Sequence, residues 1–239
     1  MNPSYFNRPW YHLLEMGQRR EDALLKLHAS GHFSSSRFEV GTAIASNVSA
    51  AVEFDAGKLR VRELRADILA GHHNGTWTAD FTVAPPTYSG AGSITRVSMA
   101  QLATLMHDNW AAGVADAQYS LAMRGLDRAS LRDSATGSAD FTWNDGLLRH
   151  VVLDGRGVPL AFSNFVGNVA LANGAFTLAD CKLQSGGASY TVKGTASYDR
   201  SLALRLERAG GGRSYVISGP LDKPRVQTLT APSAEAALR

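Results

Sequence analysis

The sequence predicts a mainly β protein: an extended, strongly twisted antiparallel sheet, either an open groove or a flattened barrel, with one or two short capping helices. Apolar and polar residues alternate over ten short segments, which is the pattern of strands with one buried face. Glycine-containing turn signals separate these segments, and Asn-Gly pairs supply the positive φ angles of tight hairpins. Most connections are too short for the crossover helix that parallel strands require, so we expect a meander.

The predicted strands and turns follow one another along most of the chain. The strands are 51–54, 59–64, 76–83, 139–143, 147–153, 169–171, 176–183, 190–197, 202–207 and 215–219. The turns are 55–57, 74–75, 144–146, 173–174, 186–187 and 210–212.

Two helices are expected to interrupt these strands. Ser98 is a suitable N-cap for a helix that ends near Gly113, and a shorter helix is expected over 127–133. The apolar stripe of the first helix consists of Met99, Leu102, Leu105, Met106 and Trp110.

A hairpin unit repeats across this interruption. Residues 52–64 and 169–181 share the pattern apolar-x-apolar-x-x-Gly-x-apolar-x-apolar-x-x-apolar, and 139–148 repeat part of it. One such hairpin cannot bury its apolar face alone. The units should therefore join edge to edge into a single sheet.

The composition is that of a folded chain with few charges. Of 239 residues, 44% are hydrophobic and 19% are charged, which excludes an intrinsically disordered chain. The net charge is +3 and the basic residues are scattered, so we expect no nucleic acid partner. The single cysteine, Cys181, forms no internal disulfide, and its place in the repeat predicts a small core side chain.

The chain is predicted to divide into three regions. Residues 1–30 form an N-terminal helical segment, 31–226 a β domain with a helical insertion near 98–133, and 227–239 a flexible tail. The first region combines aromatic and basic side chains, which suit either a membrane interface or packing on the sheet. These side chains are Tyr5, Phe6, Trp10 and Tyr11, with Arg8, Arg19 and Arg20.

Four segments, in their order and spacing, resemble the AsmA-like family of Gram-negative envelope proteins. They are residues 59–71, 98–102, 134–146 and 218–226, the last reading as a closing strand with a proline exit. The resemblance implies a curved sheet with an apolar groove, related to bridge-like lipid transfer proteins. It also implies a periplasmic location and a tether to the inner membrane through an N-terminal helix. That anchor is not in this sequence, so the resemblance implies a C-terminal module.

No segment carries a known catalytic motif. The sequence has no Gly-x-Ser-x-Gly elbow, no Gly-x-x-x-x-Gly-Lys-Ser/Thr loop and no His-Glu-x-x-His pair, so we expect neither enzymatic activity nor a cofactor. Residues 90–95 are glycine-rich but lack the third glycine of a dinucleotide-binding loop, and a turn is expected there.

Two other clusters are expected to be structural. His72 and His73 could form a metal site with Asp67 or Asp80, but neighbouring strand residues point to opposite faces. Residues 71–75 also have the composition of an exposed hairpin loop, so we expect no metal. Asp140 and Asp145 flank Trp143, but we expect Asp140 to face solvent and Asp145 to lie in a turn.

The apolar face of the sheet is the candidate site. The available helices are too few to cover about ten strands, and an uncovered apolar face requires a partner. An acyl chain fits because it needs only continuous apolar contact. We therefore expect a non-enzymatic envelope module that binds or transfers phospholipid acyl chains and supports outer-membrane assembly. The expected groove residues are Leu59, Val61, Phe81, Val83, Phe141, Trp143, Phe162, Phe176, Leu178, Tyr190, Val192 and Leu204, capped by Met99, Leu102, Met106 and Trp110.

A closed sheet is the alternative. In that case the same face packs against a second layer, which gives a dry core and no ligand. Edge strands would then pair with neighbouring AsmA-like repeats or with other envelope proteins.

Overall fold

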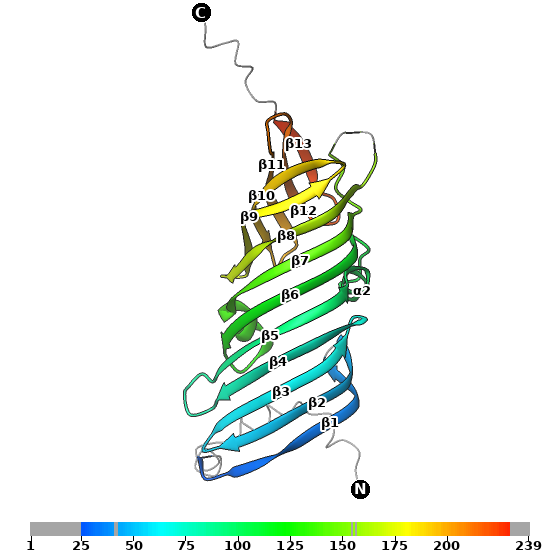
Figure 1. Ribbon diagram of the computed structural model, residues 1–239. Helices are drawn as coiled ribbons and strands as arrows, with labels where there is room; N and C mark the ends of the chain where they lie inside the picture. Colours follow the sequence, from blue (N-terminus) through cyan, green and yellow to red (C-terminus); the bar gives the residue numbers. More distant parts are fainter. Residues whose placement is uncertain (1–24, 41–42, 154, 156, 230–239) are drawn as a thin grey trace, which may run out of the picture.

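The computed structural model describes residues 25–40, 43–153, 155 and 157–229, which form one curved antiparallel sheet with two short helices (Figure 1). The thirteen strands lie in the sheet in sequence order, and the sheet is not closed into a barrel. The predicted mainly β meander is therefore confirmed, in its open form. The strands are β1 (His28–Val40), β2 (Ala43–Asp55), β3 (Lys58–Ile68), β4 (Gly71–Asp80), β5 (Thr87–Ser98), β6 (Ala111–Arg124), β7 (Thr136–Leu148), β8 (Leu160–Ala172), β9 (Ala175–Ser185), β10 (Ala188–Ser197), β11 (Ser201–Arg208), β12 (Ser214–Pro220) and β13 (Arg225–Leu229). The helices are α2 (Met99–Leu105) and α3 (Arg128–Ser134).

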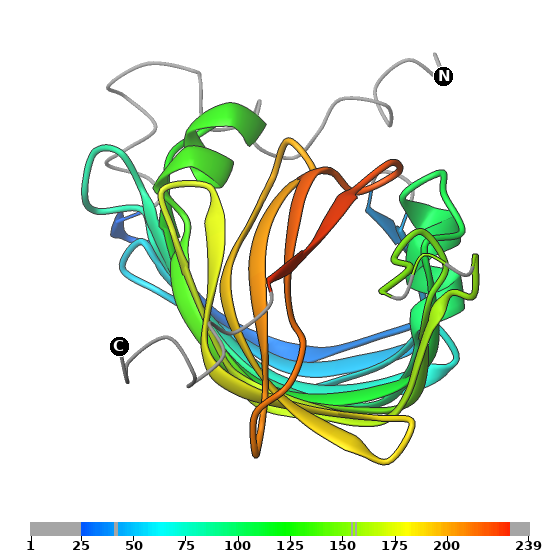
Figure 2. The same ribbon diagram turned by 90° about the horizontal axis from the view of Figure 1, so that it is seen from above.

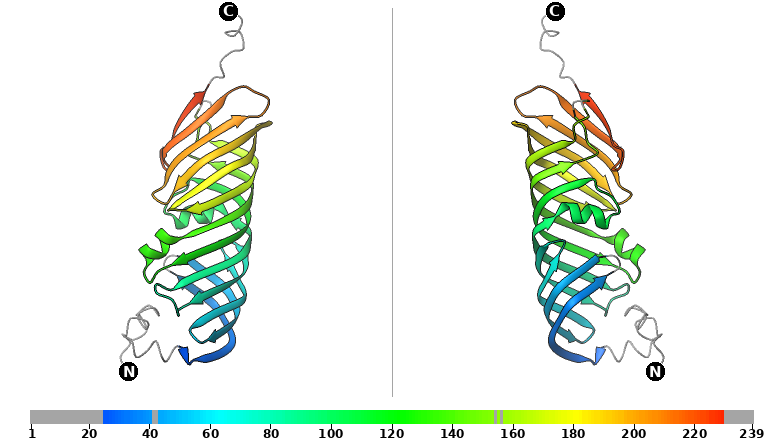
Figure 3. Two further views of the ribbon diagram at one scale, coloured as in Figure 1. Left: turned by 90° about the vertical axis from the view of Figure 1, so that its left-hand side faces the viewer. Right: turned by 90° about the vertical axis from the view of Figure 1, so that its right-hand side faces the viewer.

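The sheet is bent into a gutter that is U-shaped in cross-section (Figure 2). Helix α3 lies at one rim of the U and α2 at the other, while β11–β13 cross the opening near the C-terminal end. Seen from the sides, the strands run obliquely to the long axis of the gutter (Figure 3). One face of the sheet is therefore concave along the whole molecule.

Glycines on the concave face of β4 and β5 allow neighbouring strands to approach closely. Gly75 and Gly92 are cross-strand partners. A Cβ at Gly92 would lie 2.4 Å from the carbonyl oxygen of Asn74, and one at Gly75 would lie 2.7 Å from that of Ala91. Any other residue would push the strands apart, so these glycines permit the curvature here.

The register places apolar side chains in rows across the concave face. Val52, Val61 and Trp77 are successive cross-strand partners in β2, β3 and β4. Because side chains alternate along a strand, every second residue joins one of these rows and the residues between face outward. The predicted alternation is thus the origin of a continuous inner surface.

The main hydrophobic core cluster lies in the second half of the sheet, although Val48, Ala50, Ala79 and Val97 of the first half are also buried. Its members include Cys181, Leu183 and Ile217, whose exposed fractions are 0%, 2% and 1%. All residues of this core cluster, and all those packed against it, come from Met99 onward. We call β1–β5 the open half of the sheet and β6–β13 the closed half.

Several predicted elements are confirmed. The turns at 55–57, 173–174, 186–187 and 210–212 connect successive strands. The two full copies of the repeated unit are the β2–β3 and β8–β9 hairpins. Ser98 caps α2 by accepting a hydrogen bond from the Gln101 N–H, and α3 occupies the predicted second helix.

The predicted turns that rested on glycines within strands are wrong. Residues 71–75 and 90–95 lie inside β4 and β5, and 144–146 lie inside β7. Residues 139–148 are therefore part of one strand rather than a third hairpin. In these cases glycine makes room for a neighbouring strand or side chain, which local sequence does not distinguish from a turn.

Other predicted boundaries need correction. Helix α2 ends at Leu105, so Trp110 lies beyond it and Gly113 belongs to β6. Strand β4 ends before Val83, and β7 ends at Leu148 rather than at residue 153. Strands β1, β5, β6 and β13 were not predicted; in the first three, serine, glycine and alanine dilute the apolar alternation. Strand β1 begins at His28 and β13 ends at Leu229, so the predicted helical segment 1–30 and flexible tail 227–239 are each wrong where they overlap these strands. The region 98–133 holds both helices with β6 between them.

Most of the predicted N-terminal helix lies outside the described residues. Among those that are described, no helix has both the length and the apolar character needed to cross a membrane.

Candidate functional site

The concave face of the open half is apolar and only partly covered. Leu59, Val61 and Trp77 are half-buried there, although each lies in the middle of an apolar row. Neither helix covers this region, since both α2 and α3 pack mainly on β6. Phe33 of β1 is 42% exposed.

A cluster of aromatic rings lies along one side of this face, at the rim that carries α3. The Phe54 and Phe81 rings stack with their centroids 6.3 Å apart, and the Phe81 and Tyr88 rings meet edge to face at 6.0 Å. Leu59 is paired with Phe54 in β2 and with Ala79 in β4. Phe81, a predicted groove residue, therefore extends the apolar face beyond the end of β4.

In the middle of the open half, glycines of β5 leave the concave face without side chains of their own. Larger side chains of β4 and β6 extend over this strand from either side. A Cβ at Gly90 would lie 2.3 Å from the Trp77 ring, so this ring lies over β5. His73 Nε2 and Tyr119 Oη are 2.7 Å apart and form a hydrogen bond across β5. Burial lowers the pKa of His73 and raises the pKa of Tyr119. Burial thus favours the neutral form of both side chains.

Two adjoining hollows lie along β3–β7. The larger has a volume of about 690 Å³ and is lined by residues including Leu59, Tyr88 and Met123. The smaller, about 440 Å³, is lined by residues including Trp77 and Leu121. They share the lining residues Thr78, Ser89, Ala122 and Thr136, which form one cross-strand row with the parity of the outward-facing side chains. Each volume falls within the range of roughly 300–1,000 Å³ that is usual for small-molecule sites.

The predicted groove residues of the closed half are packed against each other instead. Trp143 and Phe162 meet edge to face at 5.0 Å, as do Phe141 and Phe165. Trp143, Phe162, Tyr190 and Val192 are all buried, and Leu178, Phe141 and Leu204 pack against them. These side chains form a dry core, so the predicted set is divided between two different environments.

The remaining predicted residues lie at the rims. Val83 is 45% exposed in the β4–β5 connection, and Phe176 is 36% exposed at the start of β9. The Phe176 ring packs against Tyr198 with the centroids 5.4 Å apart. Met99, Leu102 and Met106 are half-buried at the opposite rim, and Trp110 stands edge to face with Trp143 at 6.2 Å.

The two adjacent histidines point to opposite faces, as strand geometry requires. His73 bonds Tyr119 on the concave face, whereas His72 Nδ1 lies 2.6 Å from Asp67 Oδ1 and is exposed. Within the described ranges, no group of three or more histidine, cysteine, aspartate or glutamate side chains could hold a metal ion.

Cys181 and the two aspartates have structural surroundings. Cys181 is fully buried beside Gly167, as expected of a core side chain, and burial raises the pKa of its thiol. Asp140 is exposed and accepts a hydrogen bond from Asn168 Nδ2 at 3.0 Å. Asp145 lies within β7 with a φ of 49° and is not a hairpin turn residue.

Sequence reasoning missed several residues of the candidate site. Trp77 has the same parity as Phe81 within a predicted strand, and Phe54 is part of the repeated pattern, so both could have been found. Tyr88 and Tyr119 lie on strands that were not predicted. The hydrogen bond between His73 and Tyr119 depends on the register of three strands, which no local pattern carries.

Comparisons with known proteins give no relative: no family model, no curated protein and no solved structure matches this chain.

Proposed function

We propose that this chain is a non-enzymatic module of the cell envelope that holds or passes lipid acyl chains along the concave face of β2–β6. The observation that carries the proposal is the half-buried apolar face of the open half, illustrated by Leu59, Val61 and Trp77. Removing such surface from water is favourable by about 0.8 kcal/mol for each methylene that an acyl chain buries.

The shape of the site supports an elongated guest. The rows of apolar residues run across neighbouring strands. A chain of methylenes can follow such a surface while its head group stays in water. The resemblance to AsmA-like proteins supports phospholipid as the guest, the periplasm as the location and outer-membrane assembly as the process served.

Lipid binding is tested by native mass spectrometry of the protein purified from a bacterial host, together with uptake of a fluorescent fatty acid. We expect co-purified phospholipid and saturable uptake. The variant Val61→Asp places a charge in the apolar row and should abolish uptake. Ser49→Asp is the matched control, since Ser49 is exposed on the outer face of β2 and should leave uptake unchanged.

Two outcomes contradict the proposal. One is the absence of both bound phospholipid and fatty acid uptake in the unmodified protein. The other is equal loss of uptake in both variants while their unfolding transitions remain intact. Phe176 is a poorer test position than Val61, because it lies at the rim against Tyr198.

A second candidate function is a structural or protein-interaction module. The dry core of the closed half favours it, because Leu183, Cys181 and Ile217 leave no room for a guest there. Under this reading, partners bind at the strand edges and the concave face of the open half remains empty. The same uptake experiment separates the two functions.

A further inference from the structure

Exposed aliphatic side chains gather on three neighbouring connections at one rim of the open half. Leu25 and Leu27 precede β1, Val83 lies between β4 and β5, and Leu126 lies between β6 and α3. Their exposed fractions are 45%, 46%, 45% and 48%. We call these connections the α3 rim, and they lie on the left edge of the sheet in Figure 1.

Backbone hydrogen bonds join the α3 rim into one continuous edge. The Ala56 N–H donates to the Leu27 carbonyl at 3.2 Å, and the Phe81 N–H donates to the Gly57 carbonyl at 2.9 Å. Farther along, the Gly125 N–H donates to the Pro86 carbonyl at 3.0 Å. The exposed aliphatic side chains therefore have fixed relative positions rather than belonging to independent loops.

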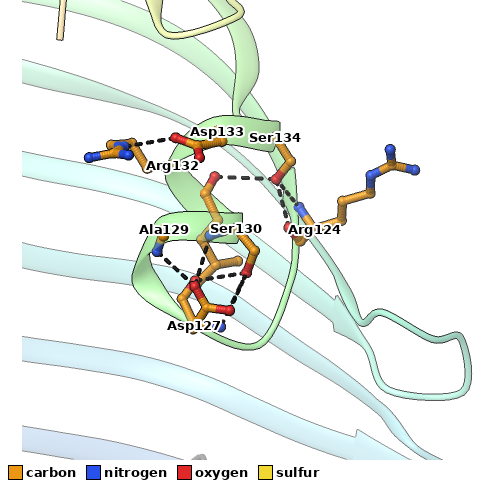
Figure 4. Close-up of polar contacts among 8 residues, drawn as sticks. Arg124, Asp127, Ala129, Ser130, Arg132, Asp133 and Ser134 are labelled. Carbon is orange, nitrogen blue, oxygen red and sulfur yellow. Dashed lines mark hydrogen bonds and ion pairs between the residues drawn. The ribbon is translucent and has the colours of Figure 1, made fainter.

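Helix α3 is held firmly at this rim. Ser134 Oγ donates to the Arg124 carbonyl at 2.6 Å and accepts from the Arg124 N–H at 2.9 Å (Figure 4). Asp127 caps the helix by accepting from the N–H groups of Ala129 and Ser130, both at 2.9 Å. The Leu126 side chain thus projects from a segment that is fixed at both ends.

The charges on the α3 rim leave cations free to meet an external anion. Three aspartates at this rim pair with neighbouring basic side chains. These pairs are Asp55 with His28, Asp80 with Lys58 and Asp133 with Arg132. Asp127 is committed to the helix cap. In contrast, Lys26, Arg124 and Arg128 have no acidic partner within 4.0 Å in the described part of the chain. Figure 4 shows the Arg124 side chain extending away from α3.

We infer that the α3 rim docks on the surface of an anionic lipid bilayer. Aliphatic side chains flanked by unpaired cations are the combination that binds a membrane interface, where the apolar groups enter the acyl boundary and the cations meet lipid phosphates. The aliphatic side chains stand on separate loop tips, unlike the fully buried centre of a protein interface.

The sequence that precedes this rim also favours a membrane as the partner. The chain enters the rim at Leu25, directly after a segment that combines aromatic and basic residues, the composition that suits a membrane interface. Docking through this rim would bring the open half of the sheet, rather than the closed half, beside the bilayer. The inference stands on the rim residues and does not require that the concave face carry lipid.

The test is co-flotation of the full chain with phosphatidylcholine vesicles, with and without phosphatidylglycerol. We expect binding that requires phosphatidylglycerol and weakens as salt is raised. The double variant Val83→Asp, Leu126→Asp should weaken binding at least about tenfold, since both apolar contacts become charged. The double variant Arg124→Gln, Arg128→Gln should weaken it about 25-fold, at about fivefold for each cation removed.

Val158→Asp is the matched control. Val158 is 69% exposed in the β7–β8 connection at the opposite rim, so its substitution should leave vesicle binding unchanged. Three results would overturn the inference: no binding to the anionic vesicles, binding that the α3-rim variants retain, or an equal loss in the control. Val61→Asp should still float with vesicles even if it loses fatty acid uptake, so failure of the docking inference and failure of lipid carriage are distinguishable.

Discussion

The two halves of the sheet share one strand pattern but differ in the size and burial of the side chains on their inner faces. In the open half, β4 and β5 place Gly75, Gly90 and Gly92 on the concave face, and the apolar side chains around them remain half-buried. In the closed half, large residues such as Phe162 and Leu183 occupy the corresponding rows, and β11–β13 cross the opening. Side-chain volume on the inner face and the crossing of β11–β13 together distinguish the packed half from the partly uncovered half.

The largest expected effect distinguishes a core leucine from a leucine in the open half. Leu183→Ala should cost about 2–5 kcal/mol of the free energy of unfolding, because Leu183 is 2% exposed in a packed core. Leu59→Ala should cost only about 1 kcal/mol, because Leu59 is half-buried. Denaturant unfolding of both variants measures the two values. Equal costs would mean that the open half is also core.

A matched pair of glycines tests the same contrast with smaller effects. A Cβ at Gly146 would lie 2.0 Å from the buried Phe162 ring, and a Cβ at Gly90 would lie 2.3 Å from the half-buried Trp77 ring. Gly146→Ala should cost about 1–3 kcal/mol, because Phe162 has no room to move. Gly90→Ala should cost less, because Trp77 can tilt toward the open side. A larger loss of unfolding free energy at Gly90 than at Gly146 would contradict this view of the open half.

The smallest expected effect is a pH dependence in the open half. Burial lowers the pKa of folded His73 below its ordinary value of 6.5. The unfolded chain therefore takes up the proton first, and the free energy of unfolding should fall as pH decreases through about 6.5, then level off below the folded-state pKa. His73→Gln should flatten this part of the profile. His72→Gln, on the outer face, is the control, and an unchanged slope in His73→Gln would disprove the assignment.

The sequence predicted the class of fold because strand alternation and hairpin turns are local properties. The repeat at 52–64 and 169–181 identified two hairpins correctly. Ser98 placed the start of α2, and the helix predicted over 127–133 differs from α3 by one residue at each end. Glycines within strands were read as turns, because a glycine that accommodates a neighbouring strand looks the same in sequence as one that needs a positive φ.

The candidate site could be predicted only in part. Leu59 and Leu204 occupy equivalent positions in the alternation, yet Leu59 lines a partly uncovered face and Leu204 packs against the core. What separates them is the crossing of β11–β13 over the closed half, which follows from the accumulated bend of the sheet. That bend depends on cross-strand distances at positions such as Gly75 and Gly92, and these distances are set by residues far apart in the chain.

The sequential strand order has a further consequence for how such a molecule can change its size. Each strand bonds only to its predecessor and its successor, so the architecture is close to one-dimensional. Inserting or deleting one hairpin in the open half would lengthen or shorten the gutter by two strand widths without disturbing any other pairing. Reach along the long axis is therefore a property that duplication of a single short segment could adjust.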